Sequence, residues 1–161
     1  MKPVEIKNGR ALIFLNPGYL YEKEAFNRDY EELRQTLRDR GFKLGFVKSQ
    51  EEEDSKWEEI RNGNTNLTHA DMVKKLRRLS EDKDSDCILV AFIGHGDKRG
   101  RDGPLEEDEM DEHFREVIFV KDKMMCVEDI WKPFLSCEKP KIFLIKACRG
   151  GKVNYALNNR S

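Results

Sequence analysis

The sequence holds few cysteines, and those it holds show neither a disulfide framework nor a metal-binding pattern. Four occur among 161 residues, at Cys87, Cys126, Cys137 and Cys148, and no two form a C-x-x-C pair. A small disulfide scaffold uses far more cysteine, and a zinc site needs clustered ligands. We therefore expect free thiols in a reducing compartment, with no metal and no other cofactor.

Long apolar runs and an excess of one charge are also missing. No stretch approaches the ~20 apolar residues of a membrane span, and residues 1–8 lack the apolar core of a signal peptide. The 30 Lys and Arg residues nearly balance 31 Asp and Glu, so no overall basic field would attract nucleic acid. We expect a cytoplasmic protein that binds neither a membrane nor nucleic acid.

The chain has enough apolar residues, at 38% hydrophobic, to form one domain with a buried core. Apolar runs bounded by turn residues predict strands at 10–16, 42–47, 87–93 and 141–147, and a hairpin at 117–126. Helical spacing of apolar residues predicts helices at 26–40, 68–80 and, more briefly, 127–135. The polar segment 48–66 is interpreted as a long surface connection with room for a helical turn, and 97–116 as a charged insertion.

This alternation of strands and helices predicts the fold class. Strands separated by helices favour a mostly parallel sheet with right-handed crossovers. We expect a single α/β domain over residues 1–161, doubly wound, with three layers and helices on both faces of the sheet.

Two of the strongest predicted strands end in reactive side chains. His95 stands between two glycines directly after the strand at 87–93, and Cys148 follows the strand at 141–147. Because the carboxyl ends of parallel strands form the functional crevice of such sheets, the two side chains are expected to meet there. A thiolate is the attacking species of a cysteine nucleophile, and a nearby imidazole can accept its proton.

Here the sequence resembles a known family. Ile145-Lys-Ala-Cys-Arg-Gly150 resembles the nucleophile signature of the caspases, in which a histidine lies about 50 residues upstream, and the separation here is 148 − 95 = 53. Lys139-Pro-Lys-Ile-Phe before the nucleophile, the first strand and the helix after it also look like the caspase large subunit, in the same order. The resemblance covers nearly the whole chain.

The resemblance implies a cysteine endopeptidase that cleaves after aspartate in apoptosis-type proteolytic signalling. It implies that Cys148 is the nucleophile and His95 the general acid and base. The oxyanion donors of the family map onto the backbone amides of Gly96 and Cys148. Protein or peptide substrates with aspartate at the cleaved bond, and a caspase small subunit or a paralogous caspase, are the implied partners.

The substrate pocket departs from the family pattern. The family's glutamine two residues before the nucleophile is Lys146 here, a cation in place of a neutral amide. By strand alternation Lys146 is expected to point the same way as Cys148. The family's pocket arginine in the loop after the first strand corresponds most nearly to Lys23, and Arg28 is the only arginine in that segment. All three basic residues are candidates for substrate binding.

Two interpretations remain open, with a third behind them. The small subunit, which supplies a second pocket arginine and the dimer interface in the family, is absent from these 161 residues, so the cleft is incomplete unless another chain supplies it. The chain is then either the large subunit of an active caspase or a catalytically impaired homologue that regulates an active caspase by pairing with it. An unrelated Cys/His hydrolase preferring basic residues is the third possibility, against which Lys146 counts through like-charge repulsion.

Overall fold

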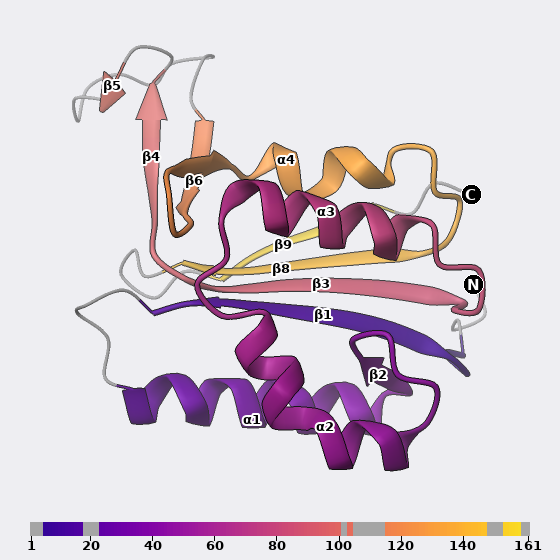
Figure 1. Ribbon diagram of the computed structural model, residues 1–161. Coiled ribbons are helices and arrows are strands. Elements are labelled where there is room, and N and C mark those ends of the chain that lie inside the picture. The colour runs from indigo at the N-terminus through magenta and orange to yellow at the C-terminus, as the bar shows by residue number, and fades with distance from the viewer. Residues whose placement is uncertain (1–4, 18–22, 101–102, 105–114, 148–152, 159–161) are drawn as a thin grey trace.

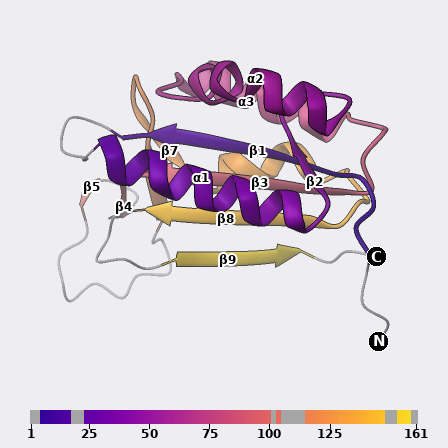
Figure 2. The ribbon, with the colours of Figure 1, turned by 90° about the horizontal axis from the view of Figure 1, so that it is seen from below.

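The fold is described by a computed structural model, which covers residues 5–17, 23–100, 103–104, 115–147 and 153–158. Its centre is a five-stranded sheet in the order β2-β1-β3-β8-β9 (Figure 1). The strands are β1 (Gly9–Asn16), β2 (Phe42–Leu44), β3 (Cys87–Gly94), β8 (Lys141–Ala147) and β9 (Val153–Asn158). The first four strands along the order run parallel, and β9 pairs with β8 in antiparallel fashion (Figure 2).

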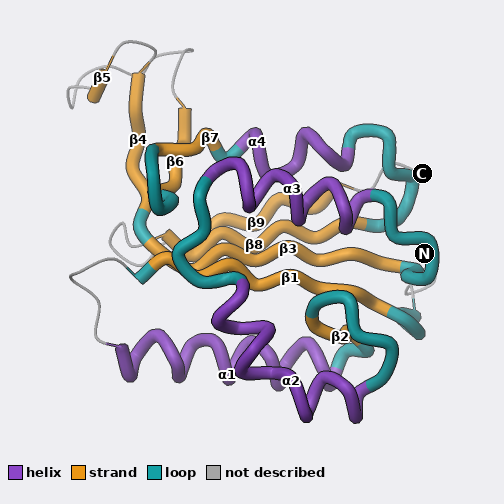
Figure 3. The backbone as a smooth tube through the Cα atoms, viewed as in Figure 1, coloured by secondary structure: helices purple, strands orange, loops and turns teal. Residues whose placement is uncertain are grey.

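Helices cover both faces of this sheet, so the molecule has three layers (Figure 3). α1 (Lys23–Asp39) and α2 (Gln50–Gly63) lie on one face. α3 (His69–Ser80), α4 (Glu128–Trp131) and the 3-10 turn η1 (Lys132–Phe134) lie on the other. None of the helices in the described ranges is long and apolar enough to cross a membrane. The α/β class with a mostly parallel, doubly covered sheet is confirmed.

The core consists of two clusters separated by the sheet, because alternate strand residues point to opposite faces. On the α1 side, Phe26 and Tyr30 of the helix pack with Ile13 and Ala91 of the strands. Leu76 of α3 packs on the opposite side with further strand residues. Every residue of β3 is buried, as expected for a central strand covered on both faces.

A second, antiparallel sheet has the order β5-β4-β6-β7 and extends from the end of β3 (Figure 1). Its strands are β4 (Gly96–Gly100), β5 (Gly103–Pro104), β6 (Arg115–Phe119) and β7 (Met124–Cys126). The predicted hairpin at 117–126 is confirmed as β6 and β7. The charged segment 97–116 was expected to be an insertion loop, but both of its ends are strands.

Two further expectations are corrected, and one strand had not been expected. The connection at 48–66 contains α2, whose first turn is capped by the Ser49 side chain accepting from the Glu52 amide at 3.1 Å. The apolar signal was weak there because the helix packs chiefly through Trp57 and Ile60 and buries a carboxylate, Glu53. β2 ends at Leu44, before Gly45 adopts a φ of 68°, so the expected strand to 47 is too long. β9 was not predicted.

Candidate active site

The candidate site lies where β1, β3 and β8 end. Gly94 is in register with Asn16 of β1 on one side and with Ala147 of β8 on the other. Residues that directly follow these three positions therefore start from one edge of the sheet. Among the described residues these are Pro17 and His95, so segments far apart in the sequence meet at one edge.

The His95 ring is held by the backbone beyond β1. Its Nε2 atom lies 2.8 Å from the carbonyl oxygen of Pro17. A carbonyl only accepts, so Nε2 carries the hydrogen, and in the neutral ring Nδ1 is then the atom that can take a proton. The imidazole is half-buried. This contact thus assigns the basic nitrogen of the candidate catalytic histidine.

Neighbouring backbone contacts fix the position of this edge. The Phe119 amide donates to the His95 carbonyl at 2.9 Å, and the Asn16 side chain donates to the Phe119 carbonyl. Gly96, the expected oxyanion donor, is the first residue of β4 and is in register with Ile118 of β6. The second sheet therefore holds the chain at the His95 carbonyl and at Gly96.

Cys148, the expected nucleophile and second oxyanion donor, lies outside the described residues. The described cysteines differ from a catalytic thiol. Cys87 is buried at the start of β3, and this burial raises the pKa of its thiol to about 11. Cys126 and Cys137 are only partly buried and lie in β7 and after η1, so neither directly follows a parallel strand of the central sheet.

Lys146 points toward α1 rather than freely into solvent. Its Nζ atom lies 2.7 Å from Oδ2 of Asp29 on that helix. The Lys146 side chain is 44% exposed and that of Asp29 is 22% exposed. Both line a pocket of about 260 Å³ between α1 and the sheet, together with Glu32 and Leu33 of the helix.

The other two candidates for substrate binding are not part of this contact. Lys23 is the first residue of α1, and its side chain lies outside what the structure describes. Arg28 stands in the helix with an exposed side chain. Among the described residues, no group of three or more His, Cys, Asp or Glu residues could hold a metal ion.

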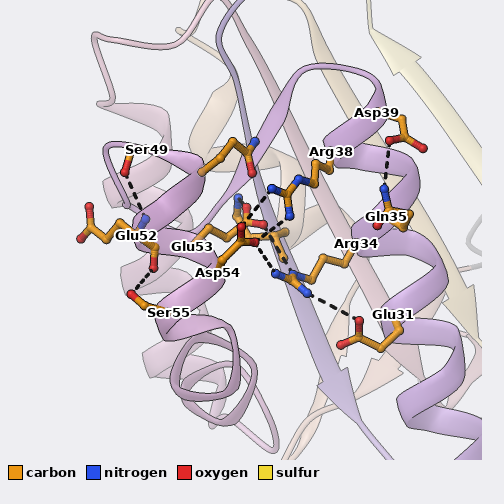
Figure 4. A network of polar contacts seen from close by, with 12 residues as sticks. Glu31, Arg34, Gln35, Arg38, Asp39, Ser49, Glu52, Glu53, Asp54 and Ser55 are labelled. Atoms are coloured by element: carbon orange, nitrogen blue, oxygen red, sulfur yellow. Dashed lines mark hydrogen bonds and ion pairs between the residues drawn. The ribbon is translucent and has the colours of Figure 1, made fainter.

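Helix α1 is itself anchored by ion pairs to α2 (Figure 4). Arg38 binds both carboxylate oxygens of Asp54, at 2.6 and 3.0 Å, and this hydrogen bonding lowers the pKa of Asp54. Arg34 lies 3.2 Å from Asp54 and 3.5 Å from the buried carboxylate of Glu53. Glu53 in turn accepts from the Leu44 amide at 2.5 Å. The network ties α1 to α2 and β2, which fixes Asp29 relative to the sheet.

Sequence reasoning missed two members of the site. The Pro17 carbonyl left no signal because every residue carries such an oxygen, and only the fold brings this one to His95. Asp29 did leave one, because it stands three residues after Phe26 and four before Leu33. Those two residues belong to the apolar face of α1, so Asp29 lies beside that face, toward the sheet.

The sequence of this chain is similar to those of known proteins over most of its length. The model of the Caspase domain family matches residues 8–161. The chain is 26% identical to Caspase-1-A of Xenopus laevis over 158 residues, which is 91% of this chain and 36% of that protein. It is 26% identical to Caspase drICE of Drosophila melanogaster over 158 residues, 91% of this chain and 37% of that protein. The chain thus spans about a third of the length of these relatives.

Proposed function

The chain belongs to the caspase domain family, and from this premise we propose that it is the large subunit of a cysteine endopeptidase that cleaves after aspartate. It acts in the cytoplasm, in apoptosis-type proteolytic signalling, together with a caspase small subunit or a paralogous caspase. Its substrates are proteins and peptides with aspartate at the cleaved bond.

One observation carries the proposal. Gly94 and Ala147 are register partners on adjacent parallel strands, and the residues directly after them are His95 and Cys148. The ring of His95 is oriented by the Pro17 carbonyl at 2.8 Å, which leaves Nδ1 as the basic nitrogen. A histidine that follows one strand in the sequence and a cysteine that follows the neighbouring strand can supply the base and the nucleophile that thiol catalysis requires.

The chemistry follows from this arrangement. Nδ1 of His95 takes the proton of the Cys148 thiol, and the thiolate sulfur attacks the backbone carbonyl carbon of the substrate aspartate. The backbone amides of Gly96 and Cys148 stabilise the developing oxyanion, each worth about 3 kcal/mol. The imidazolium then protonates the departing amine as the C–N bond breaks, and water hydrolyses the resulting thioester to regenerate Cys148.

The experiment measures hydrolysis of a peptide ending in aspartate and a reporter amine, by the full chain with its small subunit. Cys148→Ala is expected to abolish turnover because no nucleophile remains. Cys137→Ala, the same change at a thiol that is partly buried, is expected to leave kcat/KM unchanged. Turnover that survives Cys148→Ala would contradict the proposal.

A second function is favoured by the contact of Lys146 with Asp29, because a lysine tied to a carboxylate replaces the neutral amide of the family pocket. In this alternative the protein is a catalytically impaired homologue that binds an active caspase and changes its activity. The Cys148→Ala variant would then alter the rate of an added active caspase in proportion to its concentration. No effect at any ratio would remove this alternative.

A further inference from the structure

We propose that Asp29 is a specificity-determining positioning residue, which holds the Lys146 ammonium against α1 and cancels its charge beside the nucleophile. The inference rests on the proposed peptidase function and deepens it. It concerns how strongly the site distinguishes an acidic residue from a neutral one at the cleaved bond.

The geometry of the pair supports this role. Asp29 Oδ2 and Lys146 Nζ are 2.7 Å apart, a distance typical of a charge-assisted hydrogen bond. The two residues are 117 positions apart in the sequence. Asp29 belongs to α1 and Lys146 to β8. Because α1 is fixed by its bonds to Asp54 of α2, the carboxylate that receives Lys146 is itself held in place.

The location of the pair links it to the reaction. Lys146 is in register with Ile93 of β3, one position before the Gly94 and Ala147 pair that precedes His95 and Cys148. It also lines the pocket of about 260 Å³ between α1 and the sheet. A charge at this position therefore lies close in sequence and in space to the end of the strand that carries the nucleophile.

The net charge of the Asp29–Lys146 pair determines how strongly the site attracts a substrate carboxylate. With Asp29 ionised, the pair has no net charge, so an incoming substrate carboxylate gains little from Lys146. Without Asp29, Lys146 becomes an uncompensated cation that attracts this carboxylate. Without Lys146, Asp29 becomes an uncompensated anion that repels it. The two single substitutions are therefore expected to act in opposite directions.

The primary experiment compares kcat/KM for two peptides that differ only in aspartate or asparagine at the cleaved bond, using the full chain with its small subunit. Asp29→Asn should raise the aspartate-to-asparagine ratio by about fivefold, the equivalent of roughly 1 kcal/mol for a partly exposed ion pair. Lys146→Gln should lower the ratio. Asp29→Glu, which keeps the carboxylate, should leave it near the wild-type value.

The matched control is Asp39→Asn, because it removes the same charge from the same helix at its other end, where Asp39 accepts from Gln35 at 2.9 Å. It should leave the ratio unchanged. A ratio that stays within twofold of wild type in Asp29→Asn, or one that rises in Lys146→Gln, would overturn the inference.

A second measurement does not depend on turnover. The rates at which Cys148 reacts with iodoacetate, an anion, and with neutral iodoacetamide are compared by peptide mapping, with Cys126 and Cys137 as internal references. Asp29→Asn should raise the iodoacetate-to-iodoacetamide ratio at Cys148 alone, and Lys146→Gln should lower it. Unchanged ratios in both variants would contradict the inference.

The two measurements also separate this inference from the proposed function. If the wild-type protein hydrolyses neither peptide while the alkylation ratios shift as expected, the peptidase proposal fails and the role of Asp29 stands. If peptides are hydrolysed but neither ratio responds to Asp29→Asn, the role of Asp29 fails and the peptidase proposal stands.

Discussion

The parallel strands of the central sheet begin at one edge of the sheet, the amino edge, and end at the opposite one, the carboxyl edge. Charged side chains have different roles at these two edges. At the edge where the strands begin, Arg10 is buried and donates to the carbonyls of Gly45 and Val47 at 2.7 and 2.9 Å. Its Nε atom also donates to Asp82 at 3.2 Å. At the edge where the strands end, His95 and Lys146 are only partly buried.

The difference shows how one sheet divides stability from chemistry. A buried arginine bonded to two backbone carbonyls and a carboxylate stabilises the fold. A half-buried imidazole at a strand end can instead take up and release a proton during a reaction. Substitutions at the amino edge should therefore lower stability, whereas substitutions at the carboxyl edge should lower activity.

The largest effect is expected at the carboxyl edge. His95→Ala should lower kcat/KM for an aspartyl peptide by about a thousandfold, since general acid and base catalysis contributes 10²–10⁴. The midpoint of thermal unfolding should change little, because a half-buried ring is removed. His69→Ala, a change at another partly exposed histidine on α3, is the control and should keep full activity. Equal losses in both variants would contradict the assignment.

The next effect is expected at the amino edge. Arg10→Met should lower the free energy of unfolding by about 3 kcal/mol, because it leaves the Asp82 carboxylate without its charge partner in a largely buried position. Denaturant titration measures this loss, and the exposed Arg40→Met should cost less than about 0.5 kcal/mol. Folded Arg10→Met should retain the wild-type rate of Cys148 alkylation. A slower rate would show that the two edges are coupled.

A substitution at Gly94 is expected to lower both stability and activity. A Cβ there would come within 2.8 Å of the Asn16 carbonyl oxygen and 2.9 Å of the Phe92 ring. Gly94→Ala should therefore cost about 2 kcal/mol of stability through overpacking and also displace His95, so that hydrolysis falls. Gly63→Ala, where the nearest atom is 3.7 Å away, should do neither. Full activity in Gly94→Ala would show that the strand end tolerates movement.

The smallest effect concerns pH. Burial raises the pKa of the Asp82 carboxyl, but hydrogen bonds from Ser85 and the charge of Arg10 outweigh burial, so the pKa lies below its usual range. Because the folded value is lowered, the ionised group adds stability above the unfolded pKa of about 3.9. That stability disappears as the pH falls through the folded value.

Unfolding titrations at about pH 5 and pH 3 measure this term. The wild-type protein should lose more stability over this interval than Asp82→Asn, which has no carboxylate to protonate. Equal losses would show that Asp82 does not contribute to acid unfolding.

The sequence predicted most of what local patterns determine. Unbroken apolar runs located β3 and β8, and the spacing of Phe26, Tyr30 and Leu37 located α1. Two strand ends carrying His95 and Cys148 were identified from the same runs. These features depend on residues close together in the chain, where periodicity is informative.

The remaining features depend on contacts between distant segments. Helix α2 packs through few apolar residues, and its buried Glu53 accepts a hydrogen bond from the amide of Leu44. The spacing of apolar residues therefore did not predict a helix of this length. The Pro17 carbonyl reaches His95, and Asp29 reaches Lys146, only because the fold brings β1, α1 and β8 together. No local pattern encodes such pairs.

The most direct test of the central claim is the reactivity of the four thiols at neutral pH, measured by iodoacetamide alkylation and peptide mapping. Cys148 should react fastest in the wild-type protein and slow to the rate of Cys137 in His95→Ala. Cys87 should stay unmodified while the protein is folded, since its thiol is buried and its pKa is raised to about 11. Cys148 reacting no faster than Cys126 and Cys137, or at the same rate without His95, would contradict the account.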